Sequence, residues 1–513
     1  MGAALRPHWQ YDMDQLWSKL WFVFVLKTLE SFAYFTTALN LALTLTERFG
    51  YGDRAAALMF GGWGAATSAM GMVCGILIDR AGVRPSLLAG GSLLAVGRVL
   101  YATQTTHAAA VASLLVFQPL GMCLAIPVLT IAVRRLTTPG TQAAAYGVFY
   151  AAMNVGALLA GLVTDGILAE TDDAATGLER IASVVAVVTC IYVAFAVVAV
   201  PHIPRPSTHT PSCTQASRDM CVDPTFWKLI VFSGAMMGVG SVFRHVDATF
   251  PKWVVRTLGA RAHYGLLYTV NPVVVIVGAP TAQYLTAEYD GFTCMMVGAL
   301  ITATAPFVLA LLQPSYTAGV AFMLWVSVGE IIHAPRMYEY VMALAPVGNE
   351  GVFSMLASLP LFAVKLVVGM MSGDLLEQYC PAAAPTTCGR VWAVIGAVAL
   401  VSPVTLYLLQ RWLRVPPMPV VTLGHSHDHH DGGGDAVLGL YDDTDDPLAW
   451  LGTVDPLSSS PEPAKGGLGA RERPEYARFR AHAPVAAAHR ELETAAAYSG
   501  TESGAGRHFS WNS

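Results

Sequence analysis

Charged side chains are scarce in this 513-residue chain. Asp, Glu, Lys and Arg together make up 13% of the residues, hydrophobic residues make up 54%, and the mean hydropathy is +0.50. Soluble domains carry about 25% charged residues, so this composition excludes an ordinary soluble protein. P-loop, nucleophile-elbow and zincin motifs are also lacking. We therefore expect no enzyme activity, no ATP hydrolysis, no cofactor, no catalytic metal and no nucleic-acid partner.

The chain consists mainly of long apolar runs. A helix needs about 20 apolar residues to cross a bilayer, because the hydrocarbon core is about 30 Å thick and each residue rises about 1.5 Å. Twelve runs qualify, at residues 20–45, 55–78, 86–104, 108–133, 143–167, 181–200, 226–250, 266–284, 293–312, 318–343, 351–375 and 391–413. The predicted fold class is an all-α membrane protein with twelve transmembrane helices.

A stretch rich in Pro, Ser and Thr at 201–223 separates the runs into two groups of six and is typical of a linker. We therefore predict a cytosolic N-terminus at 1–15, six-helix bundles at 16–200 and 224–414, and a tail at 415–513. Two such halves indicate an internal duplication. Duplicated carriers place the substrate site between the halves, near the membrane midplane.

The arginines indicate an orientation, because positive residues favour cytoplasmic loops. Several of them follow even-numbered runs: Arg80, Arg84, Arg134, Arg135, Arg411 and Arg414. We therefore predict that both termini are cytosolic. Lys252, Arg256 and Arg261 crowd a connection that this topology places outside, so the rule holds better in the first half. The sequence leaves open a plasma membrane or an internal membrane, vacuolar or lysosomal.

Cysteines are few, and they divide by position. Cys380 and Cys388 flank a short connection predicted to lie outside, and we predict a disulfide between them. Cys213 and Cys221 lie in the cytosolic linker, where reduced thiols are expected. The cysteines within the apolar runs are interpreted as small packing residues.

The connection after the second run carries a charged motif, Gly75-Ile-Leu-Ile-Asp79-Arg80-Ala-Gly82-Val-Arg84. It resembles the signature loop of the major facilitator superfamily. Gly75 lets helices approach, Gly82 permits a tight turn, and Asp79 lies where it can pair with cations or a helix N-terminus. Arg80 and Arg84 anchor the cytosolic face. We expect this loop to take part in gating, although any short charged loop can carry such residues.

Four stretches resemble the proton-coupled oligopeptide transporter group of that superfamily, which also contains nitrate and other solute carriers. Their order along the chain carries the resemblance: Glu30-Ser31-Phe32-Ala33-Tyr34-Phe35, then Phe149-Tyr150 with Asn154-Val155-Gly156, then Asn271-Pro272 with Gly278-Ala279-Pro280, then Gly329-Glu330 with Pro335 and Ala345-Pro346. The resemblance covers most of 16–414. It implies two pseudo-symmetric bundles and symport of a small solute with protons.

The first helix departs from the pattern of that group. The group carries Glu-x-x-Glu-Arg there, and this chain has Lys27, Glu30 and Ser31 at the corresponding positions. The fourth-helix lysine of the group falls near Ile126. In the group, the missing arginine and lysine are associated with the substrate carboxylate and with proton coupling. Symport, uncoupled exchange and facilitated diffusion therefore all stay open.

Charges within transmembrane segments are costly, so they face a cavity or a partner. Lys27 and Glu30 are three residues apart and can pair on one helix face. The pair is either static, or Glu30 changes partners and carries a proton during transport. Arg244, His245 and Asp247 cluster towards the outer end of the seventh run. They form either an outer gate against the first helix, with His245 titrating near neutral pH, or a solvated cap.

Glu330, in the middle of the tenth run, is the main candidate for solute binding. The resemblance implies that this acid contacts the substrate amino group. A static ion pair with Lys365 or Lys27 is the alternative. Several side chains either line the cavity or pack between helices: Tyr34, Tyr150, Asn154, Trp325 and Tyr338. We expect Asn271 to mark a helix distortion, and three charged side chains to extend to the membrane surface: Arg98, Arg336 and Glu339.

From about residue 415 the chain is rich in Gly, Pro, Ser, Asp and Glu, which predicts a disordered cytosolic tail that regulatory proteins could bind. The histidines at 425–430 resemble a low-complexity metal-binding tract, and incidental binding is the simpler interpretation.

The sequence thus predicts a secondary active transporter that moves a small polar solute, such as a peptide, an amino acid or nitrate, by alternating access. Its partners would be the solute, protons and the lipid bilayer. Two alternatives are an uncoupled exchanger or facilitator, and a nutrient sensor that signals through the tail.

Overall fold

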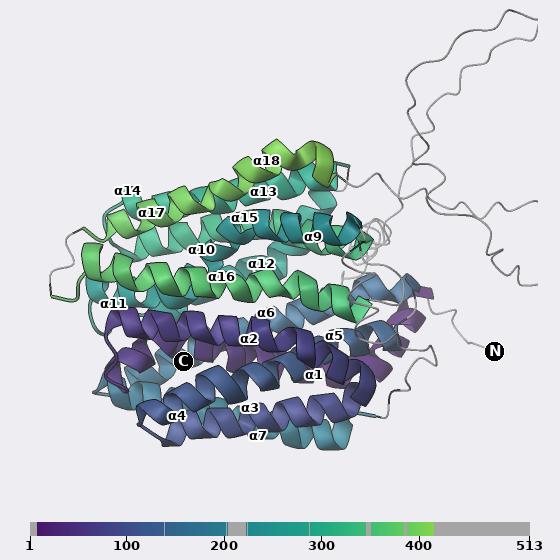
Figure 1. Ribbon diagram of the computed structural model, residues 1–513, viewed down its shortest axis with the longest axis horizontal. Helices are drawn as coiled ribbons and strands as arrows, with labels where there is room; N and C mark the ends of the chain where they lie inside the picture. The colour runs from purple at the N-terminus through teal and green to yellow at the C-terminus, as the bar shows by residue number, and fades with distance from the viewer. Residues whose placement is uncertain are drawn as a thin grey trace, which may run out of the picture. The chain divides into compact units, whose positions relative to one another are not determined.

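Long helices run side by side through the part of the chain that the computed structural model describes (Figure 1). That part comprises residues 8–137, 139–201, 203, 222, 224–286, 288–344, 350–383 and 387–414. Most of the predicted linker and the whole tail from 415 lie outside the described residues. The expectations for Cys213, Cys221 and the tail histidines therefore stay predictions.

The N-terminal half contains α1 (His8–Glu47), α2 (Asp53–Ala81), α3 (Val83–Thr103), α4 (His107–Ala112), the π-helical turn η1 (Ser113–Phe117), α5 (Gln118–Leu136), α6 (Pro139–Ala169) and α7 (Ala174–Ala199). The C-terminal half contains α9 (Pro224–Ala235), α10 (Met237–Ala248), α11 (Phe250–Leu258), α12 (Tyr264–Leu285), α13 (Gly291–Thr304), α14 (Pro306–Leu311), α15 (Tyr316–Leu344), α16 (Glu350–Tyr379), α17 (Gly389–Ala399) and α18 (Val401–Leu413).

Each of the twelve predicted runs falls on one of these helices or on consecutive ones. Within the described residues, nine helical stretches are long and apolar enough to cross a membrane, or ten if α9 and α10, which meet at a 48° bend, form one span. The two remaining runs correspond to α2 and α16, of 29 and 30 residues, which contact each other more extensively than any other helix pair. The chain is an all-α, multi-pass membrane protein.

Two large apolar cores contain most of the buried apolar side chains, and a small third cluster holds Phe32, Ala33, Ala160 and Val185. One core gathers buried side chains mainly from α1 to α7, and the other gathers them mainly from α9 to α18. In Figure 1 the first group, purple to blue, lies below the second, teal to green, and α2 and α16 lie at the boundary. We call the end of the bundle where α1 ends and α2 begins the distal end. The opposite end is the proximal end, and there Gly82, with φ +85°, turns the chain from α2 into α3.

Glycines let the two halves approach closely on the distal side. A Cβ placed on Gly369 of α16 would lie 2.5 Å from the carbonyl oxygen of Ala57 and 2.6 Å from the Cα of Gly61, both on α2. Backbone atoms cannot move aside as a flexible side chain can. The α2–α16 contact therefore depends on the missing side chain at Gly369.

Gly369→Ala should consequently lower the midpoint temperature of thermal unfolding in detergent. Overpacking costs about 1–3 kcal/mol, whereas Gly→Ala in a helix gains about 1 kcal/mol from helix propensity. Gly240→Ala on α10 is the matched control, because its new Cβ would meet Val364 at 3.8 Å, an ordinary contact. Equal midpoints for the two variants would contradict the proposed contact.

Candidate solute site between the two halves

Glu330 lies near the middle of α15, and groups from both halves hold its carboxylate. Oε1 accepts a hydrogen bond from the Tyr150 hydroxyl of α6 at 3.0 Å, and Oε2 accepts one from Asn271 Nδ2 of α12 at 2.7 Å. Asn271 Nδ2 also donates to Ser327 Oγ at 3.1 Å. Glu330, Tyr150 and Asn271 are all partly exposed. An ionisable group at this depth is costly to bury, and these donors offset part of that cost.

A second polar cluster also joins the halves. Arg244 of α10 donates from Nη1 to the Tyr34 hydroxyl of α1 at 3.0 Å and to Asp247 Oδ2 at 2.8 Å. The cluster therefore contacts the first helix through the bond from Arg244 to Tyr34. Asp247 is 3% exposed, and it interacts electrostatically with Arg244 and Lys365.

Lys365 of α16 lies within a group of aromatic rings from the other half. Its Nζ is 3.7 Å from the ring centroid of Trp63, 4.8 Å from that of Tyr34 and 5.4 Å from that of Phe60. The faces of aromatic rings attract cations, so this arrangement stabilises a fully buried ammonium group. The contacts described for Glu330 are with Tyr150 and Asn271, and a static ion pair with Lys365 or Lys27 stays a prediction.

Lys27 and Glu30 form the ion pair that their spacing allows. Lys27 Nζ is 3.2 Å from Glu30 Oε2, and the ammonium group also lies 5.2 Å from the ring centroid of Phe149. Both side chains are buried. Asn154, a further candidate, is buried on α6 and donates from Nδ2 to the carbonyl oxygen of Tyr150 at 3.0 Å. It therefore braces the helix that carries Tyr150.

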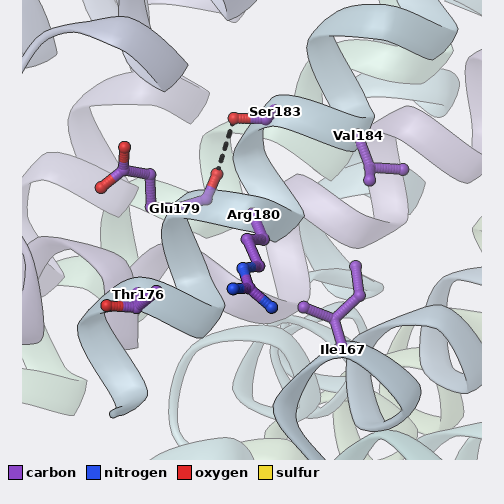
Figure 2. A pocket seen from close by; sticks show the side chains of 6 residues that line it. All are labelled: Ile167, Thr176, Glu179, Arg180, Ser183 and Val184. Carbon is purple, nitrogen blue, oxygen red and sulfur yellow. Dashed lines mark hydrogen bonds between the residues drawn. The ribbon is translucent and has the colours of Figure 1, made fainter. Parts of the chain in front are cut away.

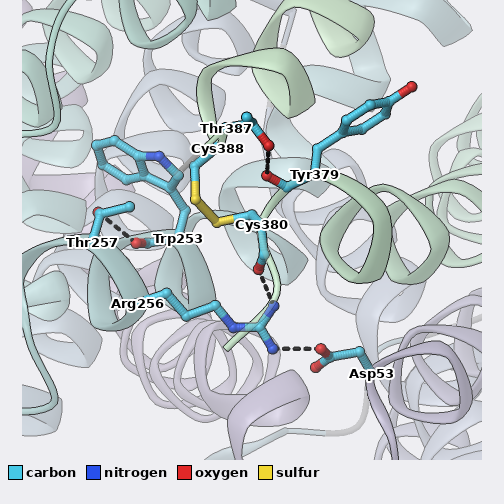
Figure 3. Close-up of a disulfide and its surroundings, with 8 residues drawn as sticks. All are labelled: Asp53, Trp253, Arg256, Thr257, Tyr379, Cys380, Thr387 and Cys388. Atoms are coloured by element: carbon cyan, nitrogen blue, oxygen red, sulfur yellow. Dashed lines mark hydrogen bonds and ion pairs between the residues drawn. A yellow bond between two sulfur atoms is a disulfide. The ribbon is translucent and has the colours of Figure 1, made fainter. Parts of the chain in front are cut away.

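The distal end holds an ion cluster that the sequence analysis did not identify. Asp53, the first residue of α2, accepts hydrogen bonds from Lys252 Nζ at 2.5 Å and from Arg256 Nη2, both on α11. Figure 3 shows the contact with Arg256. Burial opposes ionisation of this carboxyl, but the charges and hydrogen bonds of Lys252 and Arg256 outweigh burial and hold the pKa of Asp53 below its usual value. The paired carboxylate ties the two halves together.

Arg256 also connects this cluster to the predicted disulfide. Its Nη1 donates to the carbonyl oxygen of Cys380 at 2.7 Å, and Cys380 and Cys388 are joined by a disulfide in the structure (Figure 3). The bond closes the connection between α16 and α17 and places the Cys380 carbonyl beside α11. The Arg256–Cys380 bond thereby fixes the end of α16 relative to α11.

Two more contacts join the halves at the distal end. The Asp165 carboxylate of α6 accepts hydrogen bonds from the backbone N–H groups of Gly265 at 2.9 Å and Leu266 at 2.7 Å, at the start of α12. A helix N-terminus favours such an anion. The Tyr264 hydroxyl donates to Asn40 Oδ1 of α1 at 2.6 Å. Described polar contacts between the halves thus gather at the distal end and at mid-depth.

The structure places three more of the predicted residues. His245 is 1% exposed, and its Nδ1 shares a hydrogen bond of 2.8 Å with Thr249 Oγ1 of the same helix, so its part in an outer gate stays a prediction. Arg98 does not reach the membrane surface, since it is 2% exposed and donates to Thr189 Oγ1 at 2.9 Å. Asn271 donates to Glu330 from within α12, which contains Pro272, and the distortion expected at this Asn-Pro pair stays a prediction.

The charged turn lies at the proximal end, away from these clusters. Gly82 has the positive φ that the tight turn requires, Gly75 is half-buried, and Arg80 is exposed. Arg84 Nη2 donates to the carbonyl oxygen of Val197 at 3.0 Å. The side chain of Asp79 lies outside the described residues, as do those of Tyr338 and Glu339, so their predicted roles stay predictions.

A pocket of about 540 Å³ lies on α7 beside the end of α6 (Figure 2). Its lining includes Ile167, Glu179 and Arg180, and Ser183 Oγ donates to the Glu179 carbonyl oxygen at 2.9 Å. All its lining residues belong to the N-terminal half. A site for alternating access must lie between the halves, so this pocket does not fit solute transport.

Acidification should open the distal ion cluster. Because the pKa of Asp53 is lowered in the closed arrangement, the ion pair is fully present above the ordinary carboxyl value and is lost as pH falls through the lowered value. Spin labels at the distal ends of α2 and α11 should therefore move apart at low pH, and Asp53→Asn should separate them already at pH 7. Asp374→Asn is the control, because its partner Arg54 and Asp374 are both more than half exposed and such pairs contribute little. Unchanged distances in Asp53→Asn would contradict this role.

Known proteins share this architecture. The sequence matches the model of the Major Facilitator Superfamily over residues 23–369. The uncharacterized MFS-type transporter YttB of Bacillus subtilis (strain 168) is 21% identical over 155 residues, which are 30% of this chain and only 39% of the length of that relative.

Solved structures agree in fold. A POT family transporter in complex with 5-aminolevulinic acid has a TM-score of 0.64 at 14% identity and covers 77% of this chain and 96% of its own. The peptide transporter POT has a TM-score of 0.63 at 17% identity, covering 77% and 94%, and the nucleoside transporter NupG has 0.63 at 13% identity, covering 76% and 98%. The family model matches more than half of the chain, and the chain therefore belongs to the Major Facilitator Superfamily.

Proposed function

We propose that this member of the superfamily is a secondary active carrier that binds a small zwitterionic solute between its halves and moves it by alternating access, coupled to protons. The observation that carries the proposal is the position of Glu330. Its carboxylate is partly accessible at mid-depth and is held by Tyr150 from one half and Asn271 from the other. Relative movement of the halves would change the contacts of this acid and hence its affinity for a cationic group.

The charges around Glu330 favour a zwitterion. Glu330 interacts electrostatically with Arg244, which is itself 19% exposed at its side chain. An acid and a guanidinium group on one accessible surface complement a solute with an amino group and a carboxylate. Arg244 also pairs with Asp247. A bound solute carboxylate would therefore share Arg244 with Asp247 instead of meeting an unpaired cation. Amino acids and small peptides fit this arrangement better than nitrate does.

The contacts between the halves support an alternating-access cycle. Asp53 and Asp165 close the distal end, which the arginine distribution assigns to the non-cytosolic side. The described arrangement is then one state of the cycle, closed to the outside. Opening would exchange these contacts for water, since the side chains of Asp53, Lys252 and Asp165 are only 15%, 3% and 6% exposed in the closed arrangement.

An uncoupled exchanger is the second candidate function. The 3.2 Å pair of Lys27 and Glu30 lies within one helix and is already neutralised. If this pair stays intact throughout the cycle, no proton accompanies the solute. The two functions predict opposite results when a proton gradient is the driving force.

Reconstitution in liposomes that contain a trapped pH dye tests the proposal. Under an imposed potential, a pool of peptides or amino acids should acidify the lumen, and nitrate should not. Glu330→Gln should reduce uptake at least about tenfold, because loss of a charged contact to the solute costs about 2–5 kcal/mol. Glu377→Gln at the distal end is the control. Absence of both uptake and exchange with every pool would reject the carrier function.

Glu30→Gln separates the two candidates. We expect this variant to lose pH-driven uptake and to keep exchange of labelled solute, because the amide cannot take up a proton from the bulk but occupies the same space. The measurement compares acidification of the lumen, reported by the trapped dye, with counterflow of labelled solute in the same liposomes. Full pH-driven uptake by Glu30→Gln would assign proton coupling elsewhere and favour a static Lys27–Glu30 pair.

A further inference from the structure

A polar cavity lies inside the N-terminal half, away from Glu330. Its volume is about 10 Å³, close to the room that one water molecule needs. The side chains around it come from α1, α3 and α7, and most of those on α1 and α3 are polar: Thr36, Thr37, Asn40, Thr44, Arg98 and Tyr101. Such a lining is unusual in the middle of one transmembrane bundle, where apolar packing costs less.

Several buried polar atoms at this place have no partner among the described residues. They are Nε and Nη2 of Arg98 and, deeper in the same half, Oε1 of Glu30 and the hydroxyl of Tyr192. These side chains are 2% to 3% exposed. Buried groups of this kind are normally satisfied by ordered water. The guanidinium group of Arg98 both lines the cavity and interacts electrostatically with Glu30.

The threonines extend the polar surface towards the distal end. The hydroxyls of Thr36, Thr37 and Thr44 donate to the carbonyl oxygens four residues earlier at 2.7, 2.8 and 2.8 Å. Each hydroxyl oxygen therefore keeps lone pairs that can accept from water. Thr36 lies six residues after Glu30, or about 9 Å along the helix, and Arg98 lines the cavity with Thr36 and interacts electrostatically with Glu30.

An arginine covers the distal end of this row. Arg48 Nη1 donates to the carbonyl oxygen of Tyr101 at 2.7 Å and Nη2 to that of Ala102 at 2.5 Å. Its Nε is 3.8 Å from the carboxylate of Glu179, whose side chain is 56% exposed. The Arg48 side chain is only 4% exposed, so this pair connects a buried arginine beside the cavity-lining Tyr101 to an exposed carboxylate.

We propose that this row, the N-terminal polar seam (Thr44, Thr37, Thr36, Arg98 and Glu30), holds water and carries protons between the distal end and Glu30, separately from the space in which the solute moves. The inference rests on the proton coupling proposed above. A distal hydronium ion gives up a proton and becomes water, the proton passes along bound water, and it ends on the Glu30 carboxylate. The neutral acid then releases Lys27, and no electrons move.

The charged and titratable groups that act on Glu30 come from several helices. Lys27 and Tyr34 lie on its own helix, Arg98 on α3 and Tyr192 on α7. On the α6 side, Gly156 packs against the backbone of α1 next to Ser31. A cation on each side of Glu30 favours the carboxylate, so a proton must displace at least one of these interactions.

Two variants test the route without removing Glu30. Thr36→Val combined with Thr37→Val deletes two hydroxyls at nearly constant volume, and Ala182→Val fills the cavity from α7. Both should slow proton-driven uptake of an amino-acid pool at least about tenfold and leave labelled exchange within about twofold. Thr46→Val and Ala182→Ser are the matched controls, since Thr46 bonds its own helix and is not among the cavity-lining residues.

Radiolytic footprinting gives a readout that needs no solute. X-ray-generated radicals oxidise side chains beside bound water, so Ile181 and Tyr101 should be labelled in the native protein and protected in Ala182→Val. Absence of labelling in the native protein would overturn the seam. Normal proton-driven uptake in both variants would also overturn the seam. The proton would then have to pass through the space between the halves. Exchange without any acidification in the native protein would instead reject proton coupling, and this route with it.

Discussion

The cost of placing charge inside a membrane bundle governs the arrangement of this protein. Ionised groups at mid-depth are retained only where charges or hydrogen-bond donors offset that cost. The carboxylate of Glu330 illustrates the rule, because Tyr150 and Asn271 supply donors from opposite halves. The Arg244–Tyr34 contact crosses the same boundary. Any movement of the halves must therefore exchange partners, and in the proposed cycle this requirement would couple solute and proton binding to the conformation.

The distal closure combines two kinds of contact. The helices α2 and α16 approach through backbone atoms at Gly61 and Gly369, and Lys365 of α16 lies against the Trp63 ring of α2. The Asp53 cluster adds charge pairs that are largely buried, with the Lys252 side chain 3% exposed. The disulfide between Cys380 and Cys388 keeps one side of this contact in place. Because a separated buried charge must find water or another partner, opening of the distal end depends on solvation of this cluster.

Sequence reasoning succeeded where the relevant contacts are local. The twelve apolar runs predicted the helices, because the thickness of a bilayer sets the length of a spanning segment. The Lys27–Glu30 and Arg244–Asp247 pairs followed from a spacing of three residues, which places two side chains on one helix face. The turn at Gly82 followed from the tolerance of glycine for positive φ.

The sequence by itself thus determined the fold class, the two halves and the ion pairs within single helices, because helix periodicity and hydrophobic length are properties of short segments. Only the tertiary structure decided which helices face each other. Tyr150 and Glu330 are 180 residues apart, and Asp53 meets Lys252 across 199 residues. Arg98 was misplaced for the same reason: its position in the run shows its depth in the membrane, whereas the neighbouring helices decide whether it faces lipid or the interior.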